Sequence, residues 1–132
     1  MKEHVFRLKE NEDLKQSILA YCEIHHILAA TIVCAVGCIK KIHLRKAKAI
    51  EEYIKEEDYE IVSCIGTIAN NKAHIHISVS DESMHTIGGH MMEGTIVNTT
   101  AEIVLLELTD YQLDRVYDES TGYGELVVKD RK

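Results

Sequence analysis

A strict alternation of apolar and polar residues occupies positions 73–80, in the run AHIHISVS. This period of two is typical of a β-strand with one buried face. Side chains two residues apart share a face, so His74 and His76 point the same way, with Cα atoms about 6.5–7 Å apart. The alternation therefore predicts a strand that presents two imidazoles together on its polar side.

A third histidine can complete a metal site with this pair, because Zn²⁺ bound by three imidazoles keeps a fourth position open for water or substrate. His90 follows Gly88 and Gly89, which we expect to form a sharp turn, since glycine accepts positive φ without steric cost. His85 is the alternative third ligand, and a solvated edge strand that binds no metal is the alternative interpretation of the whole pattern. The favoured prediction is Zn²⁺, or another divalent transition metal, held by the pair and His90.

The residues after position 10 predict an amphipathic helix. Asn11 is expected to be its N-cap, because an asparagine side chain accepts hydrogen bonds from free backbone N–H groups of the first turn. Glu12 and Asp13 then lie in that turn, where the helix dipole favours acidic side chains. The residues that recur at helical spacing, over about 14 residues, are Leu14, Ile18, Tyr21, Cys22 and His25.

The rest of the chain is rich in runs typical of β-strands. Residues 28–40 are expected to form a long buried strand with 42–48 as its antiparallel partner, and 50–56 fit either a short helix or a loop. Further strands are expected at 3–9, 59–69, 72–80, 94–97, 98–109 and 123–129. One helix against many mostly antiparallel strands is an α+β layout.

Length and composition limit the class of protein. The 132 residues are of the usual size for one domain, so we expect a single domain over residues 1–132. The longest apolar run, residues 27–39, is too short for a membrane-spanning helix of about 20 residues, and the charged N-terminus lacks the apolar stretch of a signal peptide. The four cysteines include no C-x-x-C pair and are expected to be small buried hydrophobes. A cytoplasmic protein that binds no membrane is therefore expected.

The one basic cluster of the chain surrounds His43, at residues 40–48. Such clustering is what phosphate binding requires. An acidic run at 51–60 follows at once, however, and the chain carries a net charge of −7, which repels a polyanion. These charges favour a solvated hairpin over a nucleic-acid surface.

Glu102 interrupts a largely apolar strand at residues 99–106. A carboxylate buried in such a strand is costly unless it is paired or bound to a metal. Glu102 is therefore a candidate acid/base or fourth ligand at the histidine site, or else the partner of Arg7 or of a basic residue from a neighbouring subunit. Arg7, between Phe6 and Leu8, is the matching candidate for binding an anion.

The histidine block extends into a longer motif, HIHISVSDESMHTIGGHMMEGTIVNTTAEIVLLEL, at residues 74–108. This run resembles the signature of the PPC domain (plants and prokaryotes conserved), in which an H-x-H strand, a G-G-H turn, a downstream glycine and a T-x-E strand occur in that order. The Phe-Arg-Leu at 6–8 and the Glu-Asp-Leu at 12–14 are similar to the family's opening strand and first helical turn. The resemblance covers residues 4–128, with one departure at Asn11, where the family more often has glycine.

The resemblance implies a mixed, mainly antiparallel sheet with a flanking helix, assembled as a homotrimer. It also implies a DNA-associated regulatory or interaction module with a DNA or protein partner. Many plant members carry an AT-hook beside this domain, whereas this sequence has no Arg-Gly-Arg core and no proline. The DNA-binding description of the family therefore belongs to a segment that this sequence lacks.

The same histidine pattern is similar to the zinc sites of acetolactate decarboxylase and of a small group of zinc-dependent ester hydrolases. That resemblance implies that His74, His76 and His90 hold Zn²⁺, which polarises a carbonyl or a bound water. Glu102 would then move protons, and Arg7 would orient a small carboxylate ligand. The second hypothesis is therefore a zinc-dependent hydrolase or lyase that acts on a small carboxylate or ester.

Overall fold

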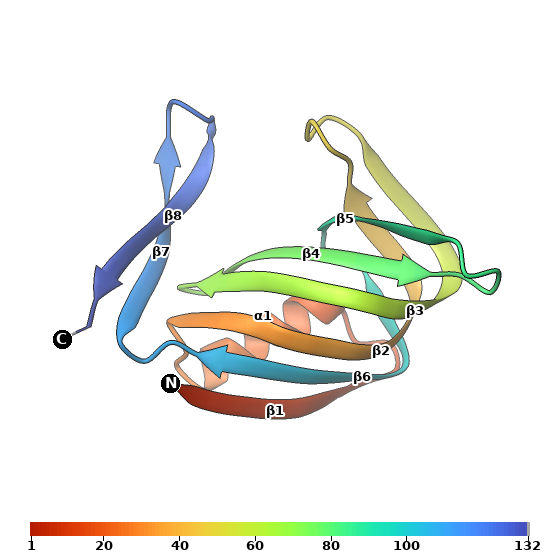
Figure 1. The fold of residues 1–132 in the computed structure, drawn as a ribbon, viewed down its shortest axis with the longest axis horizontal. Helices are drawn as coiled ribbons and strands as arrows, with labels where there is room; N and C mark the ends of the chain where they lie inside the picture. Colours follow the sequence, from red (N-terminus) through yellow and green to blue (C-terminus); the bar gives the residue numbers. More distant parts are fainter. Residues whose placement is uncertain (132) are drawn as a thin grey trace.

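A helix lies against one face of a six-stranded sheet, and a two-stranded hairpin stands beside it, in the computed structural model, which describes residues 1–131 (Figure 1). The elements are β1 (Lys2–Lys9), α1 (Leu14–Ile24), β2 (Ala29–Arg45), β3 (Glu52–Ala69), β4 (Lys72–Ser80), β5 (Thr86–Met91), β6 (Ile96–Glu107), β7 (Tyr111–Asp118) and β8 (Tyr123–Asp130). The sheet has the order β1-β6-β2-β3-β4-β5, and all its described pairings are antiparallel. The expected α+β class, with a mainly antiparallel sheet and a flanking helix, is confirmed. No helix within residues 1–131 is long and apolar enough to cross a membrane.

The core lies between α1 and the sheet. Leu14, Ile18 and Cys22 recur every four residues on the helix and are fully buried, which gives α1 a single apolar face. They pack in one cluster with alternate residues of the strands, among them Ile75 and Ile77 of β4. Each fully buried leucine or isoleucine side chain contributes about 1.5–3 kcal/mol, so this layer determines which face of β4 is turned outward.

The helix begins later than the sequence predicts. Asp13 is the N-cap, and its carboxylate accepts a hydrogen bond from the Gln16 N–H at 2.9 Å. The helix has 11 residues, and Asn11 lies in the preceding turn with a φ of 74°. The other Asp13 carboxylate oxygen accepts from the Gly94 N–H at 2.7 Å. Aspartate occupies the capping position because its two oxygens join the helix to the connection between β5 and β6.

Residues 28–40 and 42–48, expected as antiparallel partners, fall mostly within one continuous strand, β2. Its partner over this stretch is β3, and the register between the two strands shifts just after Ile39. Such a bulge bends a long strand and adjusts the direction of its side chains. Ile42 and Leu44 consequently remain buried beyond the shift, so the core supports one long strand where the sequence indicates two.

Several other boundaries also differ from the prediction. β3 occupies most of the ambiguous segment 50–56, and the expected strands 94–97 and 98–109 form a single strand, β6. The strands expected at 3–9, 72–80 and 123–129 are confirmed as β1, β4 and β8. Strands β5 and β7 are absent from the prediction, because neither TIGGHM nor YQLDRVYD has a clear alternation.

The cysteines are all free, and two of them are fully inside the protein. Burial raises the pKa of the Cys22 thiol to about 11 and that of Cys64 to about 12, which leaves both thiols protonated and inert at neutral pH. Cys34 and Cys38 are half-buried. The expectation of four buried cysteines is therefore correct for two of the four.

The β7–β8 hairpin is held against the sheet by a small set of contacts. The Asp114 carboxylate accepts a hydrogen bond from Lys72 Nζ at 3.1 Å, and Arg115 Nη2 donates to Thr67 Oγ1 at 3.0 Å. Leu113 is buried beside these polar contacts. The hairpin therefore stands over the end of β4 that carries the histidines.

Candidate metal centre

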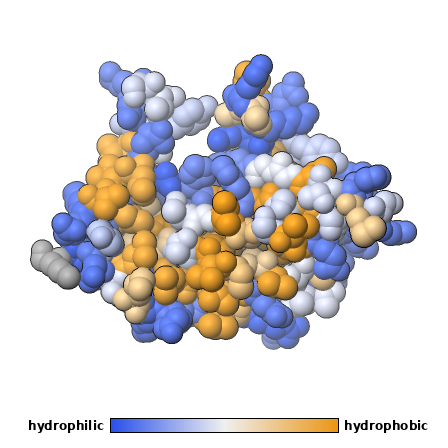
Figure 2. Space-filling view, in the orientation of Figure 1, coloured by the Kyte–Doolittle hydropathy of each residue, from blue (hydrophilic) through white to orange (hydrophobic). Residues whose placement is uncertain are grey.

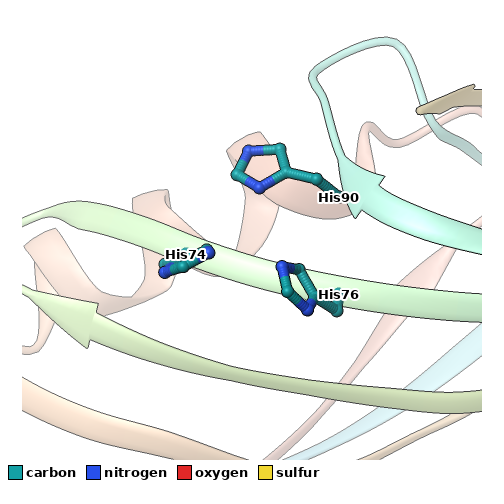
Figure 3. Close-up of side chains that lie close together, drawn as sticks. All are labelled: His74, His76 and His90. Atoms are coloured by element: carbon teal, nitrogen blue, oxygen red, sulfur yellow. The ribbon is translucent and has the colours of Figure 1, made fainter. Parts of the chain in front are cut away.

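His74 and His76 project from the outer face of β4, away from the helix (Figure 3). Ile75 and Ile77, which alternate with them, are buried in the core. The two imidazole ring centroids lie 5.0 Å apart. The alternation in the sequence thus predicts correctly both the strand and the shared face of the two histidines.

Strand β5 brings the third imidazole to this pair. It runs antiparallel to β4 and places His90 opposite His76. The His90 ring centroid is 5.3 Å from that of His74 and 5.7 Å from that of His76. One nitrogen of each ring lies within 4.8 Å of the other two nitrogens. Three imidazoles therefore converge from two neighbouring strands (Figure 3).

Gly88 and Gly89 do not form the expected turn. They lie inside β5 and have no positive φ. These glycines matter because they let the backbones of neighbouring strands approach closely. A Cβ at Gly88 would lie 2.7 Å from the Ile77 carbonyl oxygen, and a Cβ at Gly89 would lie 3.1 Å from the Arg45 carbonyl oxygen. The chain reverses earlier, at residues 81–85. The absence of these two side chains allows β5 to lie close to both β4 and β2.

His85, the alternative third ligand, lies outside the cluster. Its side chain is 83% exposed, and its Nδ1 is 3.7 Å from Asp81 Oδ2. Its backbone N–H donates to the Asp81 carboxylate at 2.9 Å, within the turn before β5. The structure therefore joins His90, and not His85, to the H-x-H pair.

The lowered pKa values of His74 and His90 suit metal binding. Burial, and next the charge of Arg45, lower the pKa of His90 to about 4. Burial, and next Arg115, also lower the pKa of His74. His90 Nδ1 is buried and has no hydrogen-bond partner among residues 1–131. Neutral imidazoles with a nitrogen left free are the form that binds a transition metal, so these residues fit a zinc-type ion.

The lowered pKa of His90 predicts a pH-dependent stability of the metal-free protein. The pKa is about 4 in the folded chain against 6.5 for the free side chain, so between these values the unfolded chain binds more protons than the folded one. The free energy of unfolding is therefore expected to fall as pH falls through this window. Urea unfolding at pH 7 and pH 5 measures the change. His90→Gln, which cannot titrate, is expected to reduce it, and an unchanged pH dependence in this variant would exclude His90 as its cause.

Arg7 and Glu102 lie elsewhere on the sheet. They are opposite each other on β1 and β6, and both side chains are exposed. Arg7 Nε donates a hydrogen bond to Thr100 Oγ1 at 2.9 Å. Because β2 and β3 separate β6 from β4, neither residue reaches the histidines of its own chain. Both face away from the core, as the histidines do.

A pocket of about 750 Å³ opens beside the histidines and is lined also by Arg45, Ser78 and Tyr123. A smaller one of about 270 Å³ adds Arg115 and Glu125. Ser78 follows from the alternation of β4, but Arg45 and the hairpin residues are not predicted from the sequence to belong to the site. Arg45 falls in a basic cluster interpreted as solvated, and Arg115, Tyr123 and Glu125 lie on a hairpin whose first strand has no clear pattern. Only contacts between segments distant in the sequence bring these four residues to the histidines.

The structure combines an antiparallel sheet, one covering helix and an outward cluster of three histidines. Together these features define a class of small α+β domains. The chain belongs to the Plants and Prokaryotes Conserved (PCC) domain family, whose model matches residues 1–109. This family, whose name is also abbreviated PPC, is the one that the histidine motif resembles, so the predicted family is confirmed. The β7–β8 hairpin lies beyond the matched residues.

The chain is also similar to part of a much longer protein. It is 33% identical over 129 residues to the bifunctional protein GlmU of Synechococcus sp. strain JA-3-3Ab, an alignment that covers 98% of this chain and 21% of the relative. GlmU of a second Synechococcus strain is likewise 33% identical, with 20% of its length covered. The chain thus spans about a fifth of the length of these curated relatives.

Two solved structures share the fold over nearly their whole length. A hypothetical protein from Salmonella enterica is 29% identical, with a TM-score of 0.94 and coverage of 99% of this chain and 95% of that one. A protein from Archaeoglobus fulgidus, described as metal-containing, is 27% identical, with a TM-score of 0.79 and coverage of 96% and 94%. Both support the strand order and the placement of the helix.

Two more distant structures show the fold alone. A candidate DNA-binding protein from Bacteroides thetaiotaomicron is 21% identical, with a TM-score of 0.83 and coverage of 98% of this chain and 93% of that one. A Staphylococcus aureus protein described as similar to alpha-acetolactate decarboxylase is 14% identical, with a TM-score of 0.58 and coverage of 82% and 53%. The similarity of architecture to acetolactate decarboxylase-like proteins is therefore confirmed.

Proposed function

We propose that this PCC-domain protein binds one divalent transition metal ion, Zn²⁺ in the first place, through His74, His76 and His90. The observation that carries the proposal is the convergence of three imidazoles, one of which leaves a buried nitrogen without a hydrogen-bond partner among the described residues. The metal-containing relative from Archaeoglobus fulgidus supports it. Three protein ligands leave a coordination position open, which is typical of sites that bind a ligand or substrate.

The proposed role of the protein is a cytoplasmic, homotrimeric regulatory or interaction module. Exposed apolar side chains support self-association: Figure 2 shows apolar surface over the middle of the sheet and over the base of the hairpin. Val33, Val36 and Ile65 of the sheet are each more than half exposed. Contiguous apolar surface of this kind usually marks an interface, so we propose that neighbouring subunits cover it.

A protein partner is preferred over DNA as the target of this module. Two of the five lysines and arginines in the basic cluster around His43 are paired with acids: Lys46 Nζ lies 3.1 Å from Glu51, and Lys40 Nζ lies 3.8 Å from Glu10. With a net charge of −7, the chain repels a polyanion. The Bacteroides thetaiotaomicron protein is described as DNA-binding, but these charges favour a protein partner for the present chain.

A zinc-dependent hydrolase or lyase acting on a small carboxylate or ester is the second candidate. The pocket of about 750 Å³ beside the histidines favours it, because a bound metal supplies a Lewis acid that can polarise a carbonyl or a water. Proposed roles for Glu102 in proton transfer and for Arg7 in orienting a carboxylate require a neighbouring subunit to bring these residues to the site.

The test of the metal proposal is the metal content of the purified, untagged protein, measured by mass spectrometry. About one zinc or other transition metal ion per chain is expected, and His76→Ala is expected to lose it. His85→Ala removes a histidine outside the cluster and should retain the metal. Light scattering on the same samples tests the assembly, since three chains of 15.0 kDa give about 45 kDa.

The absence of metal from wild-type protein, even after incubation with zinc, would overturn the proposal and remove the enzyme candidate with it. Equal metal in wild type and His76→Ala would place the ion elsewhere. A mass of one chain in solution would overturn the trimer.

A further inference from the structure

Two arginines flank the histidine cluster, and neither has an acidic partner among the described residues. Arg45 of β2 lies opposite His90, and Arg115 of β7 lines the smaller pocket together with His74. Both side chains are half-buried, and within residues 1–131 neither guanidinium has a carboxylate oxygen within 4.0 Å. A half-buried cation that lacks a counter-charge is costly, so this arrangement favours an anion from outside the chain.

Neutral contacts hold both guanidinium groups in place. Arg115 Nη2 donates to Thr67 Oγ1 at 3.0 Å, while its Nε is buried and has no hydrogen-bond partner in the part of the chain that the structure describes. The Arg45 guanidinium carbon lies 5.7 Å from the centre of the Tyr123 ring, within the range of a cation–π contact. These contacts fix the direction of the arginines, and neither guanidinium forms an ion pair within residues 1–131.

The space between the arginines is suited to a small organic molecule. The two pockets, of about 750 Å³ and 270 Å³, share Arg45, His74, His90 and Tyr123 in their walls, and sites for small ligands typically measure about 300–1,000 Å³. Lys46 and Lys48 also line the larger pocket, and Glu125 lines the smaller one. Among the described residues that line the two pockets, cations therefore outnumber carboxylates, although the chain as a whole has a net charge of −7.

The C-terminal hairpin supplies half of the residues that line the smaller pocket, and it contributes Tyr123 to the larger one. Arg115 and Tyr123 belong to β7 and β8, beyond the residues 1–109 that the family model matches. The hairpin is attached where Asp114 binds Lys72 and Arg115 binds Thr67. The hairpin therefore adds a wall that includes the Arg115 cation. The three imidazoles of the site come from the residues that the family model matches.

We propose that the cleft between β2, β4 and the hairpin binds a small organic anion, whose carboxylate or phosphate group pairs with Arg45 and Arg115 and which reaches the metal with a further oxygen atom. Arginine suits this role because its planar donors match the oxygens of either group. This inference deepens the proposed metal function and rests on it, since the metal is the second point of attachment.

The experiment uses the full chain loaded with zinc, with the zinc content of each sample measured first. Calorimetric titrations compare glycolate and methyl phosphate with the neutral glycolamide. Arg45→Gln and Arg115→Gln are expected to weaken binding of the preferred anion about tenfold or more. Lys129→Gln removes the same charge from the same hairpin but lines neither pocket, and is expected to bind within about twofold of wild type.

Glycolamide is expected to bind at least about tenfold more weakly than the preferred anion, and the tighter of the two anions identifies the group that the arginines recognise. Equal binding of glycolamide, or wild-type affinity in both arginine variants with zinc retained, would overturn the inference. Zinc uptake without binding of either anion would overturn this inference and leave the metal site standing. A chain that takes up no zinc would overturn both.

Discussion

Gly37→Ala is expected to destabilise the protein by about 3–5 kcal/mol. Gly37 has a φ of +151°, a region of backbone conformation that side chains disfavour. A Cβ there would lie 2.0 Å from the Thr100 carbonyl oxygen and 2.8 Å from its carbon. Since both are backbone atoms of the paired strand β6, no side chain can rotate to make room, and the centre of the sheet must open.

Urea unfolding measures this effect, with Gly124→Ala as the matched control. At Gly124 the nearest atom to a new Cβ is Arg115 Cβ, at 3.6 Å, which is ordinary van der Waals contact, so stability within about 0.5 kcal/mol of wild type is expected. If Gly37→Ala were as stable as this control, the close pairing of β2 and β6 at Thr100 would be wrong.

Gly88→Ala is expected to weaken zinc binding about 10–100-fold, the effect typical of groups that orient a metal ligand. A Cβ at Gly88 would lie 2.7 Å from the Ile77 carbonyl oxygen and 3.1 Å from both Ser78 Cα and Ser78 Cβ. To relieve these contacts β5 must move away from β4, and His90 moves with it.

Competition with a chromophoric chelator gives the zinc affinity of this variant, and circular dichroism reports whether the sheet is retained. Gly124→Ala again serves as the control, with wild-type affinity expected. Unchanged affinity in a folded Gly88→Ala protein would show that the contact between β4 and β5 does not position His90.

Regular patterns account for what the sequence predicts well. The alternation at 73–80 follows from one buried face, so it correctly gives β4 and the shared face of His74 and His76. The helix is predicted from its spacing, but its first residue depends on a contact with Gly94 that no local pattern contains. His90 is preferred over His85 because of the glycines before it. Those glycines do let His90 lie close to β4, but through close approach of the strands and not through the expected turn.

The remainder of the site depends on contacts between distant segments. Arg45 reaches the histidines because β2 pairs with β5, and Arg115 does so because the hairpin folds back onto β3 and β4. Glu102 attracts notice as a carboxylate in an apolar strand, yet it is exposed on the outer face. A period of two does not reveal whether the outer face of a strand is covered.

His90 is also the residue at which the sheet begins to close on itself. Its position in β5 is paired with His76 of β4 on one side and with Arg45 of β2 on the other, so four consecutive strands form a ring through this point. In zinc fingers the metal must organise an unfolded chain, and metal binding and folding are one event. Here His90, the proposed third ligand, is paired on both sides within the sheet itself, so little of the free energy of metal binding would be spent on ordering the chain. Removal of the metal by a chelator is therefore expected to leave the closed arrangement of these four strands intact.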